Sequence, residues 1–183
     1  MNFDFNGQNI IIFGGTNGVG LELAKYILKS KVKVILVCRS NKNIKSAKKY
    51  LGNKNYKIIV NNCYDGNFES IHSLCKTYFK NHIDHVVSFL GTGKVDFGIT
   101  RNISIWRDVF EKNFFSNVKI VIEFLKYFKK KDFSSSIIFT SAIAGLERVR
   151  APMTYSIAKT SLIAFTNHLA EELLKNKIRV LSI

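Results

Sequence analysis

The fold is decided by Asn9-Ile10-Ile11-Ile12-Phe13-Gly14-Gly15-Thr16-Asn17-Gly18-Val19-Gly20. An apolar run in this stretch leads directly into a turn that is rich in glycine. A turn without bulky side chains can aim backbone N–H groups at an anion above the start of a helix, where the helix dipole also favours negative charge. The stretch therefore predicts a strand, a phosphate-binding turn and a helix. A glycine turn that serves packing alone is the alternative.

Apolar runs and amphipathic stretches alternate along the rest of the chain, which is typical of a parallel sheet with helices on both faces. We expect strands at Asn9–Phe13, Val32–Cys38, Tyr56–Asn62, His85–Leu90, Ser136–Thr140 and Ile178–Ile183. We expect helices at about 18–30, 41–51, 67–81, 103–130 and 154–176. The prediction is an α/β fold, a doubly wound parallel sheet with strand order 3-2-1-4-5-6, in a single domain over 1–183.

The composition argues against several other classes of protein. The net charge is +15, but the lysines are spread along the chain and only Lys129-Lys130-Lys131 forms a run. We therefore expect a basic surface and no nucleic-acid partner. The three cysteines, Cys38, Cys63 and Cys75, are an odd number without metal spacing, which predicts buried thiols and no metal site. The sequence has no run of about 18 apolar residues, and its first residues lack the pattern of a signal peptide, so we expect a cytoplasmic protein without a membrane partner.

Tyr155 and Lys159 are four residues apart at the start of a helix-like stretch, so their side chains share a helix face. A nearby ammonium can lower the pKa of a phenol and suit it to proton transfer. Tyr50/Lys54 and Tyr127/Lys131 show the same spacing, but only the Tyr155 pair follows the fifth expected strand and continues into a helix of small residues. An ordinary helix-surface tyrosine is the alternative.

The turn at residues 14–20 and the Tyr155 pair resemble the short-chain dehydrogenase/reductase family. Its turn is T-G-x-x-x-G-x-G, with Phe13 here in place of the threonine, and the resemblance runs from the first strand to the end of the chain. It implies a nicotinamide dinucleotide held at the strand ends. The implied cofactor-binding residues are Gly14, Thr16, Asn17, Gly18, Val19, Gly20, Arg39, Ser40, Asn62, Gly91, Tyr155 and Lys159.

The end of the second strand bears on the choice of cofactor. Cys38 occupies the position where NAD-preferring relatives have an acidic residue, and Arg39 follows it. A guanidinium can pair with a 2′-phosphate, so NADP(H) is expected in preference to NAD(H). An exposed charge is the alternative for Arg39. Ser88-Phe89-Leu90-Gly91 stands where the family has Asn-Asn-Ala-Gly, so this chain loses a structural support of the sheet.

In the reaction that the resemblance implies, Tyr155 is the general acid or base, Lys159 lowers its pKa and holds the nicotinamide ribose, and Asn113 bends its helix and supports a proton relay. A solvated helix asparagine is the alternative for Asn113. The serine that polarises the substrate is missing, because its position is Ala142. As a hypothesis, Ser141 or Thr140 replaces it if the strand end shifts, although strand alternation would point Ser141 away from the site.

We therefore expect an NADP(H)-dependent oxidoreductase that interconverts a small-molecule carbonyl and an alcohol. The alternative is a catalytically impaired nucleotide-binding or regulatory protein of the same fold. Helices 103–130 and 154–176 are expected to form a dimer or tetramer interface through apolar faces that include Val109, Val121, Leu162 and Leu169, unless those faces pack on the sheet. The sequence ends at the expected sixth strand, so a C-terminally incomplete chain is also expected.

Overall fold

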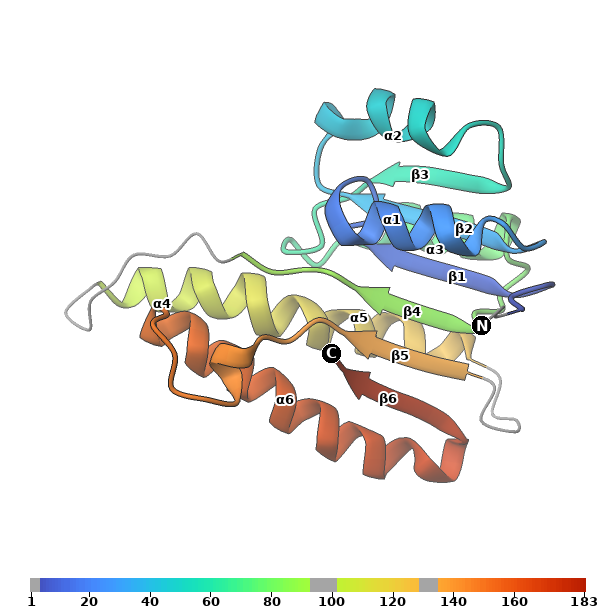
Figure 1. The fold of residues 1–183 in the computed structure, drawn as a ribbon. Coiled ribbons are helices and arrows are strands. Elements are labelled where there is room, and N and C mark those ends of the chain that lie inside the picture. Colours follow the sequence, from blue (N-terminus) through green and yellow to red (C-terminus); the bar gives the residue numbers. More distant parts are fainter. Residues whose placement is uncertain (1–3, 93–101, 129–134) are drawn as a thin grey trace.

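The computed structural model describes residues 4–92, 102–128 and 135–183, and it forms one six-stranded parallel sheet. The strands are β1 (Asn9–Phe13), β2 (Lys33–Cys38), β3 (Tyr56–Val60), β4 (His85–Ser88), β5 (Ser135–Phe139) and β6 (Ile178–Ser182). Their order is β3-β2-β1-β4-β5-β6, and Figure 1 shows them stacked from β3 at the top to β6 at the bottom. The predicted order is confirmed.

Helices cover both faces of this sheet, as predicted. They are α1 (Gly18–Ile27), α2 (Ile44–Leu51), α3 (Glu69–Thr77), α4 (Ile103–Phe110), α5 (Ser116–Phe124) and α6 (Met153–Leu173). Short 3₁₀ turns lie at Asn41–Asn43, Leu125–Tyr127, Ile143–Gly145 and Leu174–Asn176. A single π-helical turn, Glu111–Phe115, joins α4 to α5, and we call it the π-turn.

Two separate apolar cores lie on the two faces of the sheet, and strand β1 contributes alternate side chains to both. From β1, Ile10 and Ile12 join the core under α1 and α2, and the other two apolar neighbours, Ile11 and Phe13, join the core under α3, α5 and α6. Because successive side chains of a strand point to opposite faces, an unbroken apolar run is what a sheet covered on both faces requires. The two cores fix the strand register and hence the alignment of the strand ends.

Several expected elements end earlier than predicted, and three differences have a clear structural cause. The helix expected at 103–130 is interrupted by the π-turn, and its last two residues lie outside the described part of the chain. The helix expected at 67–81 ends at Thr77, because Lys80 and Asn81 take left-handed φ angles of 55° and 58° that an α-helix cannot continue. Strand β3 is only partly buried, since it lies at the edge of the sheet.

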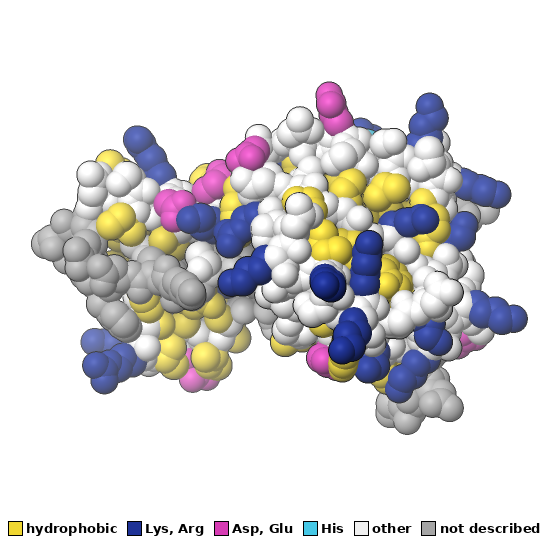
Figure 2. Space-filling view, turned by 90° about the horizontal axis from the view of Figure 1, so that it is seen from above, with side chains coloured by type: hydrophobic (Ala, Val, Ile, Leu, Met, Phe, Trp, Pro, Cys, Tyr) yellow, Lys and Arg dark blue, Asp and Glu magenta, His cyan; other side chains and the backbone are white. Residues whose placement is uncertain are grey.

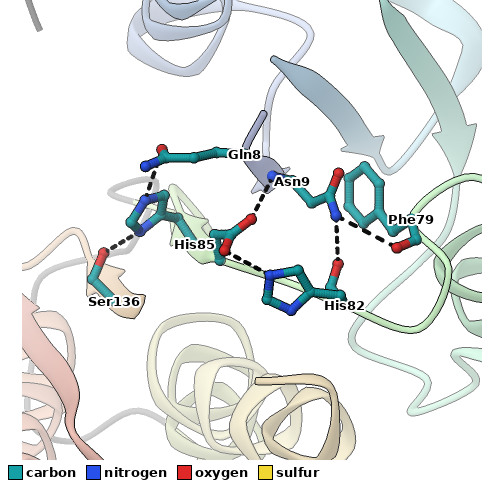
Figure 3. Close-up of polar contacts among 7 residues, drawn as sticks. Gln8, Asn9, Phe79, His82, His85 and Ser136 are labelled. Carbon is teal, nitrogen blue, oxygen red and sulfur yellow. Dashed lines mark hydrogen bonds and ion pairs between the residues drawn. The ribbon is translucent and has the colours of Figure 1, made fainter. Parts of the chain in front are cut away.

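Polar side chains tie the strands together at the amino edge of the sheet, where Figure 3 shows them as sticks. The Asp84 carboxylate accepts a hydrogen bond from the Asn9 backbone N–H at 2.8 Å and pairs with Nε2 of His82 at 2.7 Å. His85 contacts Gln8 Oε1 at 3.0 Å and Ser136 Oγ at 2.8 Å through its two ring nitrogens. This edge is therefore fastened by hydrogen bonds across β1, β4 and β5.

Candidate functional site

A cleft of about 630 Å³ lies at the opposite, carboxyl edge of the sheet, over the ends of β1, β2, β3 and β4. In an open parallel sheet this edge collects the loops that follow each strand, and ligands bind there. The volume suits a ligand of dinucleotide size. The lining residues are Gly14, Thr16, Asn17, Val37, Cys38, Arg39, Ser40, Lys42, Asn43, Asn61, Asn62, Cys63, Tyr64, Phe89, Leu90, Gly91 and Thr92.

The glycine turn at residues 14–20 is shaped as the sequence predicts. Gly14 and Gly18 have φ angles of +78° and +50°, which favour glycine over any residue with a side chain. A Cβ on Gly20 would collide with the Gly14 carbonyl oxygen. Helix α1 begins at Gly18. The turn therefore leaves backbone groups and a helix start unobstructed, which fits a pyrophosphate.

Most of the residues predicted to bind the cofactor line this cleft. Those that do are Gly14, Thr16, Asn17, Arg39, Ser40, Asn62 and Gly91. Five predicted positions do not line it, namely Gly18, Val19, Gly20, Tyr155 and Lys159. The side chain of Val19 is 69 % exposed, and Gly20 is buried against the Gly14 carbonyl, so both contribute to the turn through their backbone.

Sequence reasoning missed several lining residues that follow strands. Two examples are Lys42, which follows β2 by a few residues, and Tyr64, which follows β3. Their position just after a predicted strand was the feature that could have identified them. The Arg39 guanidinium lies 5.9 Å from the centre of the Tyr64 ring. Arg39 and Lys42 give this end of the cleft two cationic side chains, which suits a ligand with several phosphates.

Asn62 contributes an acceptor without a partner. Its Nδ2 donates to Asp65 Oδ1 at 2.8 Å, while its own Oδ1 is buried and has no hydrogen bond within the described residues. A buried polar atom without a partner costs stability and is uncommon in folded proteins. Asn62 lines the cleft, so this unpartnered acceptor belongs to a residue of the cleft wall.

Lys159 is buried next to the cleft. Its side chain is 3 % exposed and donates from Nζ to the Thr140 carbonyl at 2.7 Å. Burial lowers the pKa of Lys159 to about 8. A Cβ on Gly91 would lie 3.2 Å from Lys159 Nζ, so the lining residue Gly91 and the ammonium are immediate neighbours.

Tyr155 is half-buried on the first turn of α6, with its ring centre 5.9 Å from Lys159 Nζ. The expected lowering of its pKa by Lys159 is not what the structure shows. Burial removes water from the phenolate and raises the pKa of Tyr155, and the Lys159 ammonium is directed at the Thr140 carbonyl. The phenol is therefore protonated at neutral pH.

Asn113 lies inside the π-turn and is completely buried. Its Oδ1 accepts from the Thr92 N–H at 3.0 Å, and its Nδ2 donates to the Val109 carbonyl at 3.0 Å and the Thr92 carbonyl at 3.3 Å. A Cβ on Gly91 would lie 2.8 Å from Asn113 Oδ1. The structure thus brings Asn113, Gly91 and Lys159 together, and the predicted helix bend takes the form of the π-turn.

The hydroxyl groups near Ala142 are not engaged within the described part of the protein. Thr140 Oγ1 and Ser141 Oγ are both buried and have no hydrogen-bond partner within the described residues. Strand β5 ends at Phe139, so strand alternation does not fix the direction of Ser141. A substitute hydroxyl from Thr140 or Ser141 therefore stays a prediction.

The apolar side chains predicted for a dimer interface are mostly used inside the chain. Val109, Val121, Leu162 and Leu169 are at most 7 % exposed and belong to the core or the packing around it. Other apolar side chains of the same helices are open to solvent, namely Ile103, Phe115, Ile122, Met153 and Ile157. The surface that could meet another copy therefore differs from the predicted one.

The surface and the cysteines agree with the composition. Figure 2 looks down on the α2 end of the molecule and shows Lys and Arg side chains scattered among polar and apolar ones. Cys38, Cys63 and Cys75 are buried free thiols. Within the described ranges, no helix is long and apolar enough to cross a membrane, and no group of His, Cys, Asp or Glu could hold a metal ion.

Comparisons with known proteins agree with this geometry. Residues 8–183 match the family model described as short chain dehydrogenase. A fatty acyl-CoA reductase of Acinetobacter baylyi is 26 % identical over 97 % of this chain and 61 % of its own length. The 3-oxoacyl-[acyl-carrier-protein] reductase FabG of Salmonella typhimurium is 24 % identical over 96 % of this chain and 71 % of its own length.

A likeness to solved structures supports the fold. The Pseudomonas aeruginosa RhlG/NADP active-site complex superposes with a TM-score of 0.83 at 18 % identity, and the match covers 98 % of this chain and 72 % of that one. This chain spans about two thirds of the length of such relatives. Because the family model matches nearly the whole chain, the protein belongs to the short-chain dehydrogenase family.

Proposed function

We propose that this protein is an NADP(H)-dependent oxidoreductase that interconverts a carbonyl and an alcohol by hydride transfer. One observation carries the proposal: Gly91, which lines the cleft, lies against both Asn113 Oδ1 and Lys159 Nζ. Gly91 therefore connects the cleft to Lys159, and we infer that a bound cofactor extends from the phosphate-binding turn to the Tyr155–Lys159 pair. The name of the relative FabG, a 3-oxoacyl-[acyl-carrier-protein] reductase, supports the same class of reaction.

The preference for NADP(H) rests on the cations of the cleft. Arg39 and Lys42 line it and are exposed, and Cys38 holds the position at which a carboxylate would favour NAD(H). A guanidinium and an ammonium stabilise a 2′-phosphate by charge-assisted hydrogen bonds, whereas a ribose hydroxyl gains little from them. The solved complex of RhlG with NADP is a relative in fold that binds this form of the cofactor.

The nicotinamide supplies or accepts the hydride when the cofactor is bound. Tyr155 is the proton donor for reduction, because its raised pKa keeps the phenol protonated at neutral pH. Lys159 is charged below its pKa of about 8, so it stabilises negative charge that develops on the Tyr155 oxygen. Asn113 holds the Gly91–Thr92 segment through its hydrogen bonds to Thr92. Reduction should therefore be favoured over oxidation at neutral pH.

A second candidate function is nucleotide binding without efficient turnover. It is favoured by Ala142, which has no hydroxyl to polarise a carbonyl, and by the burial of the nearby Thr140 and Ser141 hydroxyls. Loss of one donor to a developing oxyanion costs on the order of 10² to 10³ in turnover. We therefore expect the protein to be a slow enzyme.

Titration of the protein with NADPH, followed by fluorescence, and then a panel of ketones and aldehydes separates these candidates. Binding followed by NADPH oxidation supports the oxidoreductase. Binding without oxidation of NADPH on any carbonyl supports the regulatory protein. Absence of binding to both NADPH and NADH contradicts both.

Restoring the serine tests the assignment of position 142. Ala142→Ser should raise turnover by up to about 10² to 10³, because it adds one oxyanion donor. NADPH affinity should stay the same, since Ala142 does not line the cofactor cleft. The matched control is Ala151→Ser, which adds the same hydroxyl before α6. Equal rates in the two variants would show that position 142 is misassigned.

We further infer that the protein forms a dimer through the π-turn, α5 and α6. The proposal rests on the exposed side chains of Phe115, Ile122 and Ile157, which are 46 %, 69 % and 40 % exposed. Light scattering on the protein and on an Ile122→Lys variant tests it. A monomeric native protein would contradict it.

A further inference from the structure

A chain of buried hydrogen bonds connects the end of β4 to the π-turn. The Ser88 hydroxyl donates to Asn117 Oδ1 at 2.6 Å, and it accepts from the Leu90 backbone N–H at 3.3 Å. Ser88 is 0 % exposed and Asn117 is 1 % exposed. Because the Leu90 N–H occupies an acceptor site of the Ser88 oxygen, the hydroxyl proton is free to be donated to Asn117.

Asn117 passes this connection to the π-turn. Its Nδ2 donates to the Asn113 backbone carbonyl at 3.1 Å. In an α-helix that carbonyl would accept from the backbone N–H four residues later, but the π-turn shifts the pattern by one residue. Ser116 Oγ similarly donates to the Lys112 carbonyl at 3.2 Å. Side chains of α5 thus donate to carbonyls of the widened turn.

Asn113 connects the π-turn to the segment that lines the cleft. Its side chain is hydrogen-bonded to both the N–H and the carbonyl of Thr92. The segment after β4 is therefore fastened to the π-turn twice, at Ser88 through Asn117 and at Thr92 through Asn113. Thr92 is one of these two points, and Gly91 lies between them in the chain. Both residues line the cofactor cleft, and Gly91 also lies against Lys159.

The same hydrogen bonds explain how the end of β4 is supported although Ser88 and Phe89 stand in place of the family's two asparagines. The amide that supports the end of β4 comes from helix α5 instead, as Asn117. Hydrogen bonds in a chain at low local dielectric strengthen one another, and a partner removed from such a chain leaves buried polar atoms without compensation. A change at Ser88 should therefore be felt at Thr92.

We propose that Ser88 and Asn117 are positioning residues, which fix the orientation of Asn113 and thereby hold Gly91 and Thr92 in place at the cleft wall and beside Lys159. The effect on turnover rests on the proposed oxidoreductase function. The effect on the backbone of Thr92 does not. Neither residue touches the cofactor cleft directly.

The test is amide hydrogen exchange at Thr92 in Ser88→Ala, Asn117→Leu and the double variant. Each single change should speed exchange of the Thr92 N–H about tenfold or more, because its bond to Asn113 is loosened. If Ser88 acts through Asn117, the double variant should match Asn117→Leu alone within about twofold. Ser136→Ala is the control: it removes an equally buried hydroxyl that bonds His85 at the opposite edge (Figure 3) and should leave Thr92 unchanged.

Kinetics on the same variants tests the consequence for the reaction. Turnover should fall about ten- to a hundredfold in Ser88→Ala and Asn117→Leu, because a small misplacement of reacting groups is costly, while KM for NADPH changes less than about threefold. Ser136→Ala should keep the native rate.

The inference would be overturned if the Thr92 N–H exchanged at the same rate in Ser88→Ala as in Ser136→Ala. It would also be overturned if the increases in exchange rate caused by the two single changes multiplied in the double variant. If the native protein turns over no carbonyl, the proposed function fails, but the exchange measurements still decide the positioning role.

Discussion

The amino and carboxyl edges of the sheet both carry buried polar side chains, but these side chains differ in how many hydrogen-bond partners they have. At the amino edge, Asp84 and His85 each have two hydrogen-bond partners (Figure 3). At the carboxyl edge, Lys159 is buried with a carbonyl as its partner and no carboxylate within ion-pair distance among the described residues. Most of the buried side-chain atoms without a partner in the described ranges also lie there, on Asn62, Thr140, Ser141 and Thr154.

This difference indicates where the molecule gives up stability. Unpaired buried polar atoms and a desolvated cation each destabilise the folded state, so a fold retains them mainly where they serve a ligand. At the amino edge, His82 Nδ1 and Ser135 Oγ are the buried atoms without a partner among the described residues, while Asp84 and His85 are paired.

Tyr155→Phe should lower turnover by about 10² to 10⁴, because it removes the proton donor, and leave NADPH affinity unchanged. The free energy of unfolding should not fall, since the Tyr155 hydroxyl is not engaged in any hydrogen bond that the described structure gives it. Tyr50→Phe is the matched control, because Tyr50 has the same spacing to a lysine but lies on α2, where its hydroxyl bonds Glu22. Steady-state rates measure both. Equal rates for Tyr155→Phe and the native protein would remove Tyr155 from the mechanism.

Lys159→Met tests the buried charge through stability. Burial lowers the pKa of Lys159 from its ordinary 10.5 to about 8, so the folded protein disfavours the proton that the unfolded chain keeps. The native free energy of unfolding should therefore rise with pH from about 8 to about 10.5 by about 3 kcal/mol relative to the variant. Urea unfolding of both proteins across this range measures it, with the exposed Lys54→Met as control. Parallel pH profiles would show that Lys159 is not desolvated.

Arg39→Ala should weaken NADPH binding about ten- to a hundredfold and leave NADH binding nearly unchanged, because only NADPH carries the 2′-phosphate. Fluorescence titrations with both cofactors measure the ratio. Arg148→Ala removes an exposed arginine outside the cleft and should change neither affinity. An equal loss for NADH and NADPH would mean that Arg39 contacts a group common to both.

At the amino edge the expected effect is on stability alone. Burial lowers the pKa of His85. The negative charge of Asp84 raises this pKa by a smaller amount, and the positive charge of Arg179 lowers it further. The unfolded chain therefore binds more protons just below the ordinary histidine pKa of about 6.5, and the free energy of unfolding should fall as the pH drops through it. His85→Gln should reduce this slope, and the exposed His168→Gln should not. A slope that is the same in His85→Gln and the native protein would count against a desolvated His85.

The sequence predicted the sheet well because strand burial is written in local patterns. The run Ile10–Phe13 alternates between two cores, which requires apolar residues at every position. The interruption at the π-turn was harder to predict, since the only local signal was Asn113 in mid-helix. Its partners, Thr92 and Asn117, are defined by the packing of β4 against α5.

The site shows the same division. The glycine turn and Arg39 were recognised because their backbone shape and charge are local properties. Lys42, Tyr64 and Phe89 were missed, because a residue lines a cleft through the positions of neighbouring strands. The pKa of Tyr155 was predicted in the wrong direction, since the spacing to Lys159 suggested attraction while the extent of burial was unknown.

Local sequence patterns were enough to predict the order of strands and helices, the glycine turn and the identity of the groups available for chemistry. These depend on side-chain size, backbone freedom and periodicity, which act over a few residues. Which groups are desolvated and which are paired became clear from the packed molecule: the lowered pKa of Lys159, the buried hydroxyls beside Ala142 and the Ser88–Asn117–Asn113 connection. Desolvation and hydrogen bonding depend on atoms brought together from distant parts of the chain, so no local pattern encodes them.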